Sequence, residues 1–301
     1  MIGLNLFVGY FGRKNLGDDL MLNVLYKNEK DYVLLQDSNF YSFISDDKQI
    51  VLNLNPIYKT LQKIYNLFKL KRQNVNKIIF GGGTQFSSSS SIITQIDIFI
   101  FLVFAKLLGY KIEANSIGIG AFSSKNFLIK SSLKLFDHIS VRDKTSSFKL
   151  KKALIRHDLG NDLVYKINFN KKKVKIPDKI LITATGSVLA LNKTYLNNYL
   201  EFIVKNVPKN YENLVYTVFQ EDEDEFIYKI LKKTFSNIKI QTPKTNFEIE
   251  KLYNSSIEVI GMRYHSLILA DIFNLPFKGF SYDDKVKDLC RKKNMVFKSA
   301  K

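Results

Sequence analysis

The chain has 301 residues, of which 46% are hydrophobic, and this length suits two domains of about 150 residues each. A single cysteine, Cys290, excludes an intrachain disulfide and a multi-cysteine metal site, and it favours a reducing, cytoplasmic compartment. The formal net charge of +18 comes mainly from scattered lysines, without an arginine-rich helix or a zinc spacing. We therefore expect no specific nucleic-acid binding, and either a solvated basic surface or attraction to anionic substrates or an anionic inner-membrane surface.

The N-terminal half alternates short β-like runs with helical patterns, which is typical of a doubly wound parallel sheet. We expect strands in IGLNLFVGYF, DYVLLQD, KQIVLNLN, NKIIFGGG, YKIEANSIGIG and HISVRD, and helices over 18–27, 58–71, 92–108 and 125–136. The apolar helix over 92–108 carries Asp97 and Lys106 and is shorter than the roughly 20 residues of a membrane span. We therefore expect it to be a buried helix.

A lysine-rich stretch, NFNKKKVKIPDK, interrupts this rhythm over 168–179 and predicts a linker. Strands are then expected in KILITATG, NLVYTVF, IKIQTP and IEVIG, and helices over 193–206, 223–235 and 247–254 and after His265. The sequence thus predicts two Rossmann-like α/β domains, 1–170 and 171–301, with mainly parallel sheets facing a central cleft. In such sheets ligands bind beyond the carboxyl ends of the strands.

The first glycine-rich strand end is GYFGRKNLGDDLML, near the N-terminus. Its glycines fit neither the GxGxxG fingerprint nor the GxxxxGK[ST] loop. One interpretation is a tight turn that leads into a helix with Asp18 or Asp19 as N-cap. The other is a backbone-lined pocket for a sugar or an anion, in which Asn15 and Asp18 bind hydroxyl groups.

Two further strand ends carry candidate binding residues. In IIFGGGTQF, Gly81, Gly82 and Gly83 follow a buried strand, and three glycines in a row allow close approach of a ligand or of a neighbouring part of the chain. In ISVRDKTS, Arg142 follows another strand. Alone it predicts a surface arginine next to a helix cap, and it becomes a site candidate only together with the other motifs.

The strongest local motif is IEVIGMRYHSLILADIF, where a strand ending at Ile260 precedes a helix from about Tyr264. A helix N-terminus directs backbone N–H groups at an anion, and Arg263 adds a planar fork for carboxylate or phosphate. His265 adds a side chain that exchanges protons near neutral pH. The alternative is a surface arginine and a capping histidine. No neighbouring His or Cys completes a metal-ligand set, so no metal is expected.

Taken in order, seven segments resemble the polysaccharide pyruvyltransferase family. They are GYFGRKNLGDDLML, IIFGGGTQF, NSIGIGAF, ISVRDKTS, DLVY, GMRYHSLILA and FSYDDKVKDL. The resemblance implies a type-B glycosyltransferase-like fold and transfer of a pyruvyl group from phosphoenolpyruvate to two hydroxyls of a sugar in a bacterial surface glycan or its precursor, which gives a cyclic ketal and phosphate. It implies that Arg263 and His265 serve the phosphoenolpyruvate site, and phosphoenolpyruvate is a donor substrate, so no cofactor is expected.

The resemblance also sets expectations for the remaining residues. Many relatives carry an arginine just after the first strand of the C-terminal domain, whereas this chain reads LITATGSV there. Either hydroxyls such as that of Thr185 replace the arginine, or the donor pocket differs. We expect Ser266 to donate to phosphate and His265, as imidazolium, to protonate the donor. The acceptor is expected on the side of domain 1–170, near the residues Asn15, Asp18, Gly81, Gly82, Gly83 and Arg142.

Three functions stay open at this point. The first is the pyruvyltransferase, with an acceptor sugar that is lipid-linked, nucleotide-linked or polymeric. The second is a nucleotide-sugar-dependent glycosyltransferase of the same architecture, in which Arg263 would contact a diphosphate. The third is a non-catalytic basic module that binds an anionic glycan or nucleic acid, which predicts strongly salt-dependent binding and indifference to changes at His265.

Overall fold

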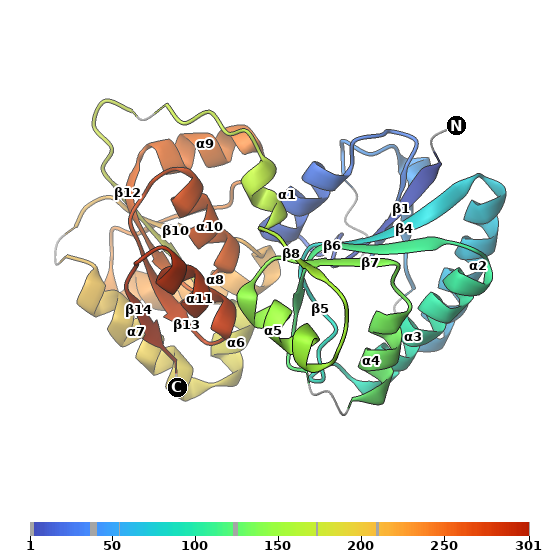
Figure 1. The fold of residues 1–301 in the computed structure, drawn as a ribbon. Coiled ribbons are helices and arrows are strands. Elements are labelled where there is room, and N and C mark those ends of the chain that lie inside the picture. The colour runs from blue at the N-terminus through green and yellow to red at the C-terminus, as the bar shows by residue number, and fades with distance from the viewer. Residues whose placement is uncertain are drawn as a thin grey trace. The chain divides into compact units, whose positions relative to one another are not determined.

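Two α/β units, each built on a parallel sheet, make up the chain (Figure 1). The computed structural model describes residues 3–36, 41–53, 55–122, 126–172, 174–208 and 211–300. The first unit comprises Met1–Arg13 and Asp18–Leu163, and the second comprises Lys14–Gly17 and Val164–Lys301. The crossing segment, Lys14–Gly17, therefore belongs to the second unit although its sequence neighbours belong to the first. The domain boundary predicted from the sequence lies between residues 170 and 171, and the crossing segment was not predicted.

In the first unit the strand order is β3-β2-β1-β4-β6-β7-β8, with β5 paired to β6. The strands are β1 Leu4–Val8, β2 Tyr32–Leu35, β3 Gln49–Val51, β4 Val75–Gly81, β5 Thr84–Gln85, β6 Lys111–Ile119, β7 His138–Val141 and β8 Asp158–Leu159. The helices are α1 Leu16–Leu25, α2 Pro56–Arg72, α3 Ile92–Leu107, α4 Phe127–Lys134 and α5 Lys144–Lys152. Strand order reverses between β1 and β4. The switch point of this unit therefore lies at the carboxyl ends of these two strands, where the first two glycine-rich turns begin.

In the second unit the order is β11-β10-β9-β12-β13-β14. The strands are β9 Lys179–Thr183, β10 Leu214–Thr217, β11 Lys239–Gln241, β12 Ser256–Gly261, β13 Phe277–Ser281 and β14 Phe297–Ser299. The helices are α6 Gly186–Leu191, α7 Lys193–Asn206, α8 Glu221–Thr234, α9 Asn246–Asn254, α10 Tyr264–Ile272 and α11 Asp284–Lys292. Here the order reverses between β9 and β12, which places the Arg263 motif at the switch point.

The predicted fold class is confirmed, because every strand pair in the described ranges is parallel. Helix α7 has the predicted bounds, while β5, α5, β8, α6 and the elements after α10 were not predicted. Helix α1 begins at Leu16, so Asp18 and Asp19 lie in its first turn and neither is its N-cap. Residues 2, 37, 54, 125 and 173, which fall in predicted elements or the linker, lie outside the described residues.

The expectation of a buried helix over 92–108 was wrong in part. Helix α3 buries Phe101 and Leu102, but Ile92, Ile93 and Leu107 are exposed. None of the helices in the described residues is long and apolar enough to cross a membrane.

Candidate functional site

The switch point of the second unit brings Arg263 and His265 to the carboxyl end of β12. Gly261 ends this strand, and a Cβ there would lie 2.4 Å from the Thr183 carbonyl oxygen, so only glycine lets β12 lie this close to the end of β9. The Met262 N–H donates to the same carbonyl at 3.0 Å. Arg263 is then the N-cap residue of α10. The motif is therefore held against the turn that follows β9.

Arg263 binds a buried carboxylate that the sequence analysis did not single out. Its Nε donates to the carbonyl of Ala184 at 2.9 Å and to Oδ2 of Asp224 at 3.1 Å, while Nη2 pairs with Oδ1 of Asp224. Asp224 is fully buried and also accepts the backbone N–H groups of Gly186, Phe219 and Gln220, each at 3.1 Å. Burial works to lower the pKa of Arg263, but the charge and hydrogen bonds of Asp224, together with the charges of Tyr282 and Glu223, outweigh burial and raise the pKa. The alternative of a surface arginine is wrong.

The crossing segment completes this network within the second unit. Asn15 Nδ2 donates to Oε1 of Gln220 at 3.1 Å, and the Leu16 N–H donates to the Phe219 carbonyl at 2.8 Å. The same Gln220 oxygen accepts a long 3.4 Å bond from Nη1 of Arg263. Asn15 was expected on the side of domain 1–170, but the structure places it in the unit of Arg263, two hydrogen bonds away from the guanidinium.

His265 lies against the other end of the crossing segment. A Cβ built on Gly17 would lie only 1.9 Å from Nδ1 of His265, so the backbone of Gly17 and the imidazole are in close contact. The His265 ring also packs edge-on against Tyr264, with ring centroids 5.6 Å apart. Its side chain is half-buried. Gly17, the third glycine of the N-terminal motif, is thus explained by the room that it leaves for the His265 ring.

Hydroxyl groups line the ends of β9 and β10. The buried Ser266 Oγ donates to the Arg263 carbonyl at 2.7 Å and lies 2.8 Å from Thr183 Oγ1, so its full burial argues against the expected donation to phosphate. Thr185 Oγ1 and Thr217 Oγ1 are buried and have no hydrogen-bond partner among the described residues. A buried hydroxyl without a partner is uncommon, which keeps Thr185 as a candidate for ligand binding.

In the first unit, packing explains the three consecutive glycines. Gly82 and Gly83 have φ angles of +65° and +63°, which favour glycine. A Cβ at Gly81, Gly82 or Gly83 would lie 2.1 to 2.7 Å from side-chain atoms of Leu25, Met21 or Tyr10, respectively. These neighbouring side chains occupy the space that the sequence analysis offered to a ligand.

Arg142 is also not a surface residue. Its Nη1 pairs with Oδ2 of Asp162 at 2.8 Å, the two side chains being 2% and 0% exposed. Its guanidinium also approaches the Thr84 hydroxyl, at 3.5 Å, and Asp162 belongs to the DLVY motif. Arg142 thus ties β7 to the segments that follow β4 and β8. Contact with an acceptor does not fit this burial.

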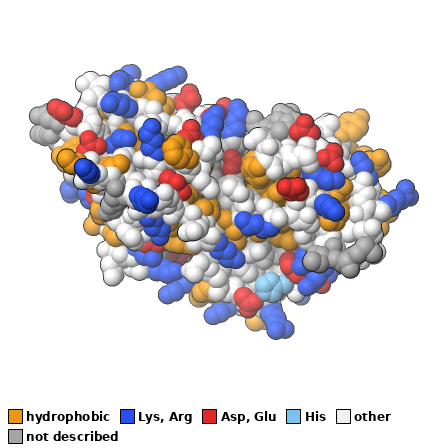
Figure 2. All heavy atoms as spheres, turned by 90° about the horizontal axis from the view of Figure 1, so that it is seen from above, with side chains coloured by type: hydrophobic (Ala, Val, Ile, Leu, Met, Phe, Trp, Pro, Cys, Tyr) orange, Lys and Arg blue, Asp and Glu red, His pale blue; other side chains and the backbone are white. Residues whose placement is uncertain are grey.

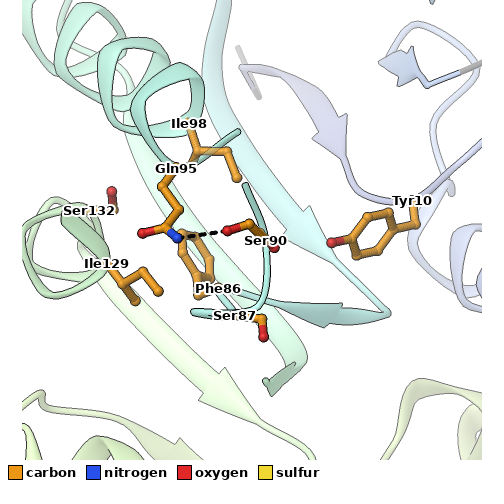
Figure 3. A pocket seen from close by; sticks show the side chains of 8 residues that line it. All are labelled: Tyr10, Phe86, Ser87, Ser90, Gln95, Ile98, Ile129 and Ser132. Carbon is orange, nitrogen blue, oxygen red and sulfur yellow. Dashed lines mark hydrogen bonds between the residues drawn. The ribbon is translucent and has the colours of Figure 1, made fainter. Parts of the chain in front are cut away.

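A small pocket in the first unit lies beyond the end of β5 (Figure 3). It has room for about one water molecule. Phe86, Ile98 and Ile129 give it an apolar side, and Tyr10 and a serine-rich loop give it hydroxyls. Gln95 donates to the Ser90 carbonyl at 2.9 Å and so holds this loop against α3. A sugar ring does not fit this space. Two of the lining residues, Tyr10 and Phe86, lie in the motifs GYFGRKNLGDDLML and IIFGGGTQF.

Asp19 forms a second titratable cluster in the first unit. The Tyr41 hydroxyl donates to Asp19 at 2.5 Å and accepts the Gly12 N–H at 2.8 Å. Burial raises the pKa of Asp19 to about 7, with the Tyr41 hydrogen bond opposing this shift and the charge of Asp18 adding to it. Burial and then the Asp19 charge raise the pKa of Tyr41. The cluster ties the turn after β1 to the start of α1.

Comparison with solved structures finds UDP-GlcNAc 2-epimerases. The enzyme from Methanocaldococcus jannaschii has a TM-score of 0.64 and 12% identity, covering 99% of this chain and 89% of that one. The Neisseria meningitidis enzyme bound to UDP-GlcNAc has a TM-score of 0.61 and 13% identity, covering 99% and 87%. Anabaena HepE in complex with UDP and glucose has a TM-score of 0.59 and 10% identity, covering 93% and 81%. At these identities the likeness shows a type-B glycosyltransferase-like fold alone.

Sequence comparison gives a more specific result. No match is found among curated proteins. The family model for polysaccharide pyruvyl transferase matches residues 15–284, which span both units and include the crossing segment from Asn15 onward together with Arg263 and His265. The chain therefore belongs to the polysaccharide pyruvyl transferase family.

Proposed function

We propose that the chain transfers the pyruvyl group of phosphoenolpyruvate to two hydroxyls of a sugar in a surface glycan or its precursor, forming a cyclic ketal and releasing phosphate. The observation that carries the proposal is the family match together with the position of Arg263 and His265. Both follow the carboxyl end of β12 at a switch point, which is where open parallel sheets bind ligands.

Arg263 and the start of α10 are suited to an anionic donor. The guanidinium is held on one side by Asp224 and Ala184, whereas its Nη1 reaches Gln220 through a single 3.4 Å bond. We assign this Nη1 to a donor oxygen, with the Gln220 amide turning aside when the donor binds. The N–H groups of the first turn of α10 and the Thr185 hydroxyl supply further donors. This set takes the place of the arginine that many relatives carry after the first strand of their C-terminal domain.

His265 is assigned as the proton donor. Protonation of C3 of phosphoenolpyruvate by an imidazolium turns the methylene into a methyl group and leaves C2 with oxocarbenium character. One sugar hydroxyl adds to C2 and loses its proton; the second hydroxyl then adds as the C2–O bond to phosphate breaks. Two hydroxyl protons are released, one is needed to restore the imidazolium and one leaves with hydrogen phosphate, so atoms and charge balance.

For the acceptor, we keep Asn15 and Asp18 as proposed contacts. Asn15 lies beside Gln220, and Asp18 is a buried carboxylate in the first turn of α1. Gly81, Gly82, Gly83 and Arg142 are assigned to the packing of the first unit, since their neighbours account for their chemistry. The acceptor is proposed to be lipid-linked or nucleotide-linked.

The test is incubation with phosphoenolpyruvate and a panel of lipid-linked and nucleotide-linked sugars. We expect phosphate release together with a product whose mass has increased by one pyruvyl ketal. His265→Ala should abolish both signals while the variant still melts at the wild-type temperature. Thermal stabilisation by UDP- or CMP-sugars in the absence of any response to phosphoenolpyruvate would overturn the proposal in favour of a nucleotide-sugar-dependent transferase.

A further inference from the structure

Helices α2 and α3 of the first unit expose apolar side chains and bury charged ones. They pack side by side on one face of the sheet (Figure 1). Between them Lys63 Nζ and Asp97 Oδ2 form an ion pair at 2.5 Å, with both side chains buried, and Asp97 also accepts the Thr60 hydroxyl at 2.6 Å. The two helices also bury apolar residues such as Leu67 and Phe101, but on the solvent side they expose apolar side chains where an ordinary surface helix carries polar ones.

The exposed side of α2 is a continuous apolar stripe. At 100° per residue the exposed side chains from Ile57 onward fall within an arc of about 120°. They are Ile57, Tyr58, Leu61, Tyr65 and Phe68, followed by Lys69 and Arg72 in the last turns. The helix contains no Asp or Glu. A stripe of this kind stands in water only at a free-energy cost, so it marks an interaction surface.

The outer side of α3 extends the apolar surface. Ile92, Ile93, Ile96 and Leu107 are exposed, and Leu107 is 76% exposed. The single acidic residue of this helix, Asp97, is the one paired with Lys63. The apolar surface formed by these α2 and α3 side chains is called here the α2–α3 face, and its described side chains carry positive charge only.

We propose that the α2–α3 face docks onto a lipid bilayer surface that carries anionic headgroups. Isoleucine, leucine and phenylalanine side chains enter the boundary of the acyl chains, tyrosines lie at headgroup level, and Lys69 and Arg72 reach phosphate. Charge decides against a second copy of this chain as the occupant. Two copies would bring net charges of +18 together, whereas an anionic bilayer attracts such a charge. Lys and Arg side chains are also spread over the surface shown in Figure 2. The inference does not depend on which group the enzyme transfers.

The test is flotation of the purified 301-residue chain with lipid vesicles. We expect the protein to float with phosphatidylcholine vesicles that contain about one-third phosphatidylglycerol, and to float much less with phosphatidylcholine alone. The triple variant Ile57→Ser/Leu61→Ser/Phe68→Ser should lower the partition coefficient about tenfold or more. A matched control, Ile176→Ser/Leu191→Ser/Phe247→Ser, removes the same three residue types from more exposed positions of the second unit and should bind like the wild type. Thermal melting of both variants checks that they are folded.

Three outcomes overturn the proposal. The first is wild-type protein that stays unbound in the presence of anionic vesicles. The second is an α2 variant that binds as well as the control variant. The third is a wild-type dimer in solution that becomes a monomer in the α2 variant, since a second copy would then cover the α2–α3 face.

Discussion

Gly17 and His265 touch: a methyl group at Gly17 would lie 1.9 Å from the imidazole Nδ1. The two residues are held in place by different parts of the sequence, the crossing segment and the first turn of α10. Any side chain at position 17 must therefore displace the ring that we assign as the proton donor.

The first prediction follows from this contact. In Gly17→Ala the imidazole is pushed aside, and because a side chain can rotate at little cost, the fold is retained. We expect kcat to fall about tenfold to hundredfold with little change in melting temperature. The NMR signals of the His265 ring should shift as well, a readout independent of turnover. Gly160→Ala is the control, because its Cβ would find no atom closer than 3.8 Å. Equal effects of the two substitutions would contradict the proposed link.

The second prediction concerns the buried pair of Arg263 and Asp224. Arg263→Ala leaves the Asp224 carboxylate buried without its counter-charge, so we expect a loss of about 3–5 kcal/mol in the free energy of unfolding. Lys244→Ala, which removes an exposed partner of Glu221, should change it by less than about 1 kcal/mol. Urea denaturation measures both. A small effect of Arg263→Ala would show that the guanidinium does not keep its contact with Asp224 in solution.

Because of this coupling, Arg263→Lys is the better variant for kinetics. It keeps the charge but loses the planar fork that reaches Asp224 and Gln220 together. We expect a raised KM for phosphoenolpyruvate in a protein that is still folded, and a normal KM would remove Arg263 from the donor site.

The third prediction uses the raised pKa of Asp19, about 7 when folded and near 3.8 when unfolded. Between these values the folded state binds more protons than the unfolded state, so the contribution of Asp19 to stability falls as pH rises through this window. Asp19→Asn lacks this dependence. We expect it to be more stable than the wild type by about 1–2 kcal/mol at pH 8, because the side chain is only half-buried, and the gain to vanish near pH 4.

Unfolding curves at several pH values test this. Asp222→Asn changes the net charge equally at a 79% exposed side chain and serves as the control. If the Asp19→Asn and Asp222→Asn profiles run parallel between pH 4 and pH 8, Asp19 does not titrate in this range.

The fourth prediction separates backbone strain from packing at Gly83. Gly83 and Gly109 both have positive φ angles, +63° and +72°, but only Gly83 has close neighbours, with Tyr10 at 2.7 Å. Gly109→Ala should therefore lower the free energy of unfolding by about 1 kcal/mol through strain alone. Gly83→Ala should lower it by about 1–3 kcal/mol more. Equal losses would mean that Tyr10 moves away freely, and that the space is open to a ligand.

The alternation of apolar runs was sufficient to predict most strands and helices, because parallel strands buried on both faces are continuous apolar segments. Helix α7 was predicted with its observed bounds because its apolar residues recur with the period of a helix. Helix α6 is only six residues long and too short to show a period. The exposed side of α3 was missed because a predominantly apolar sequence does not indicate which side faces solvent.

The motif sequence predicted Arg263 and His265 as site candidates but could not give their partners. Asp224 is one of four acidic residues in the first turn of α8, and only the packing of the helix decides which carboxylate turns inward. The assignment of Asn15 likewise depends on a contact with Gln220, 205 positions away. Long-range contacts of this kind leave no local pattern in a sequence.

The crossing segment makes the chain pass between the two units three times, at Arg13/Lys14, Gly17/Asp18 and Leu163/Val164. During synthesis Asn15 and Leu16 are among the first residues to emerge from the ribosome. Their partners Phe219 and Gln220 emerge about two hundred residues later. The second unit therefore cannot be completed from the C-terminal part of the chain alone. Cleavage after Leu163 leaves an N-terminal fragment that carries residues 14–17 and a C-terminal fragment that lacks them. When the two fragments are mixed, residues 14–17 must bind to the C-terminal fragment before the second unit is complete.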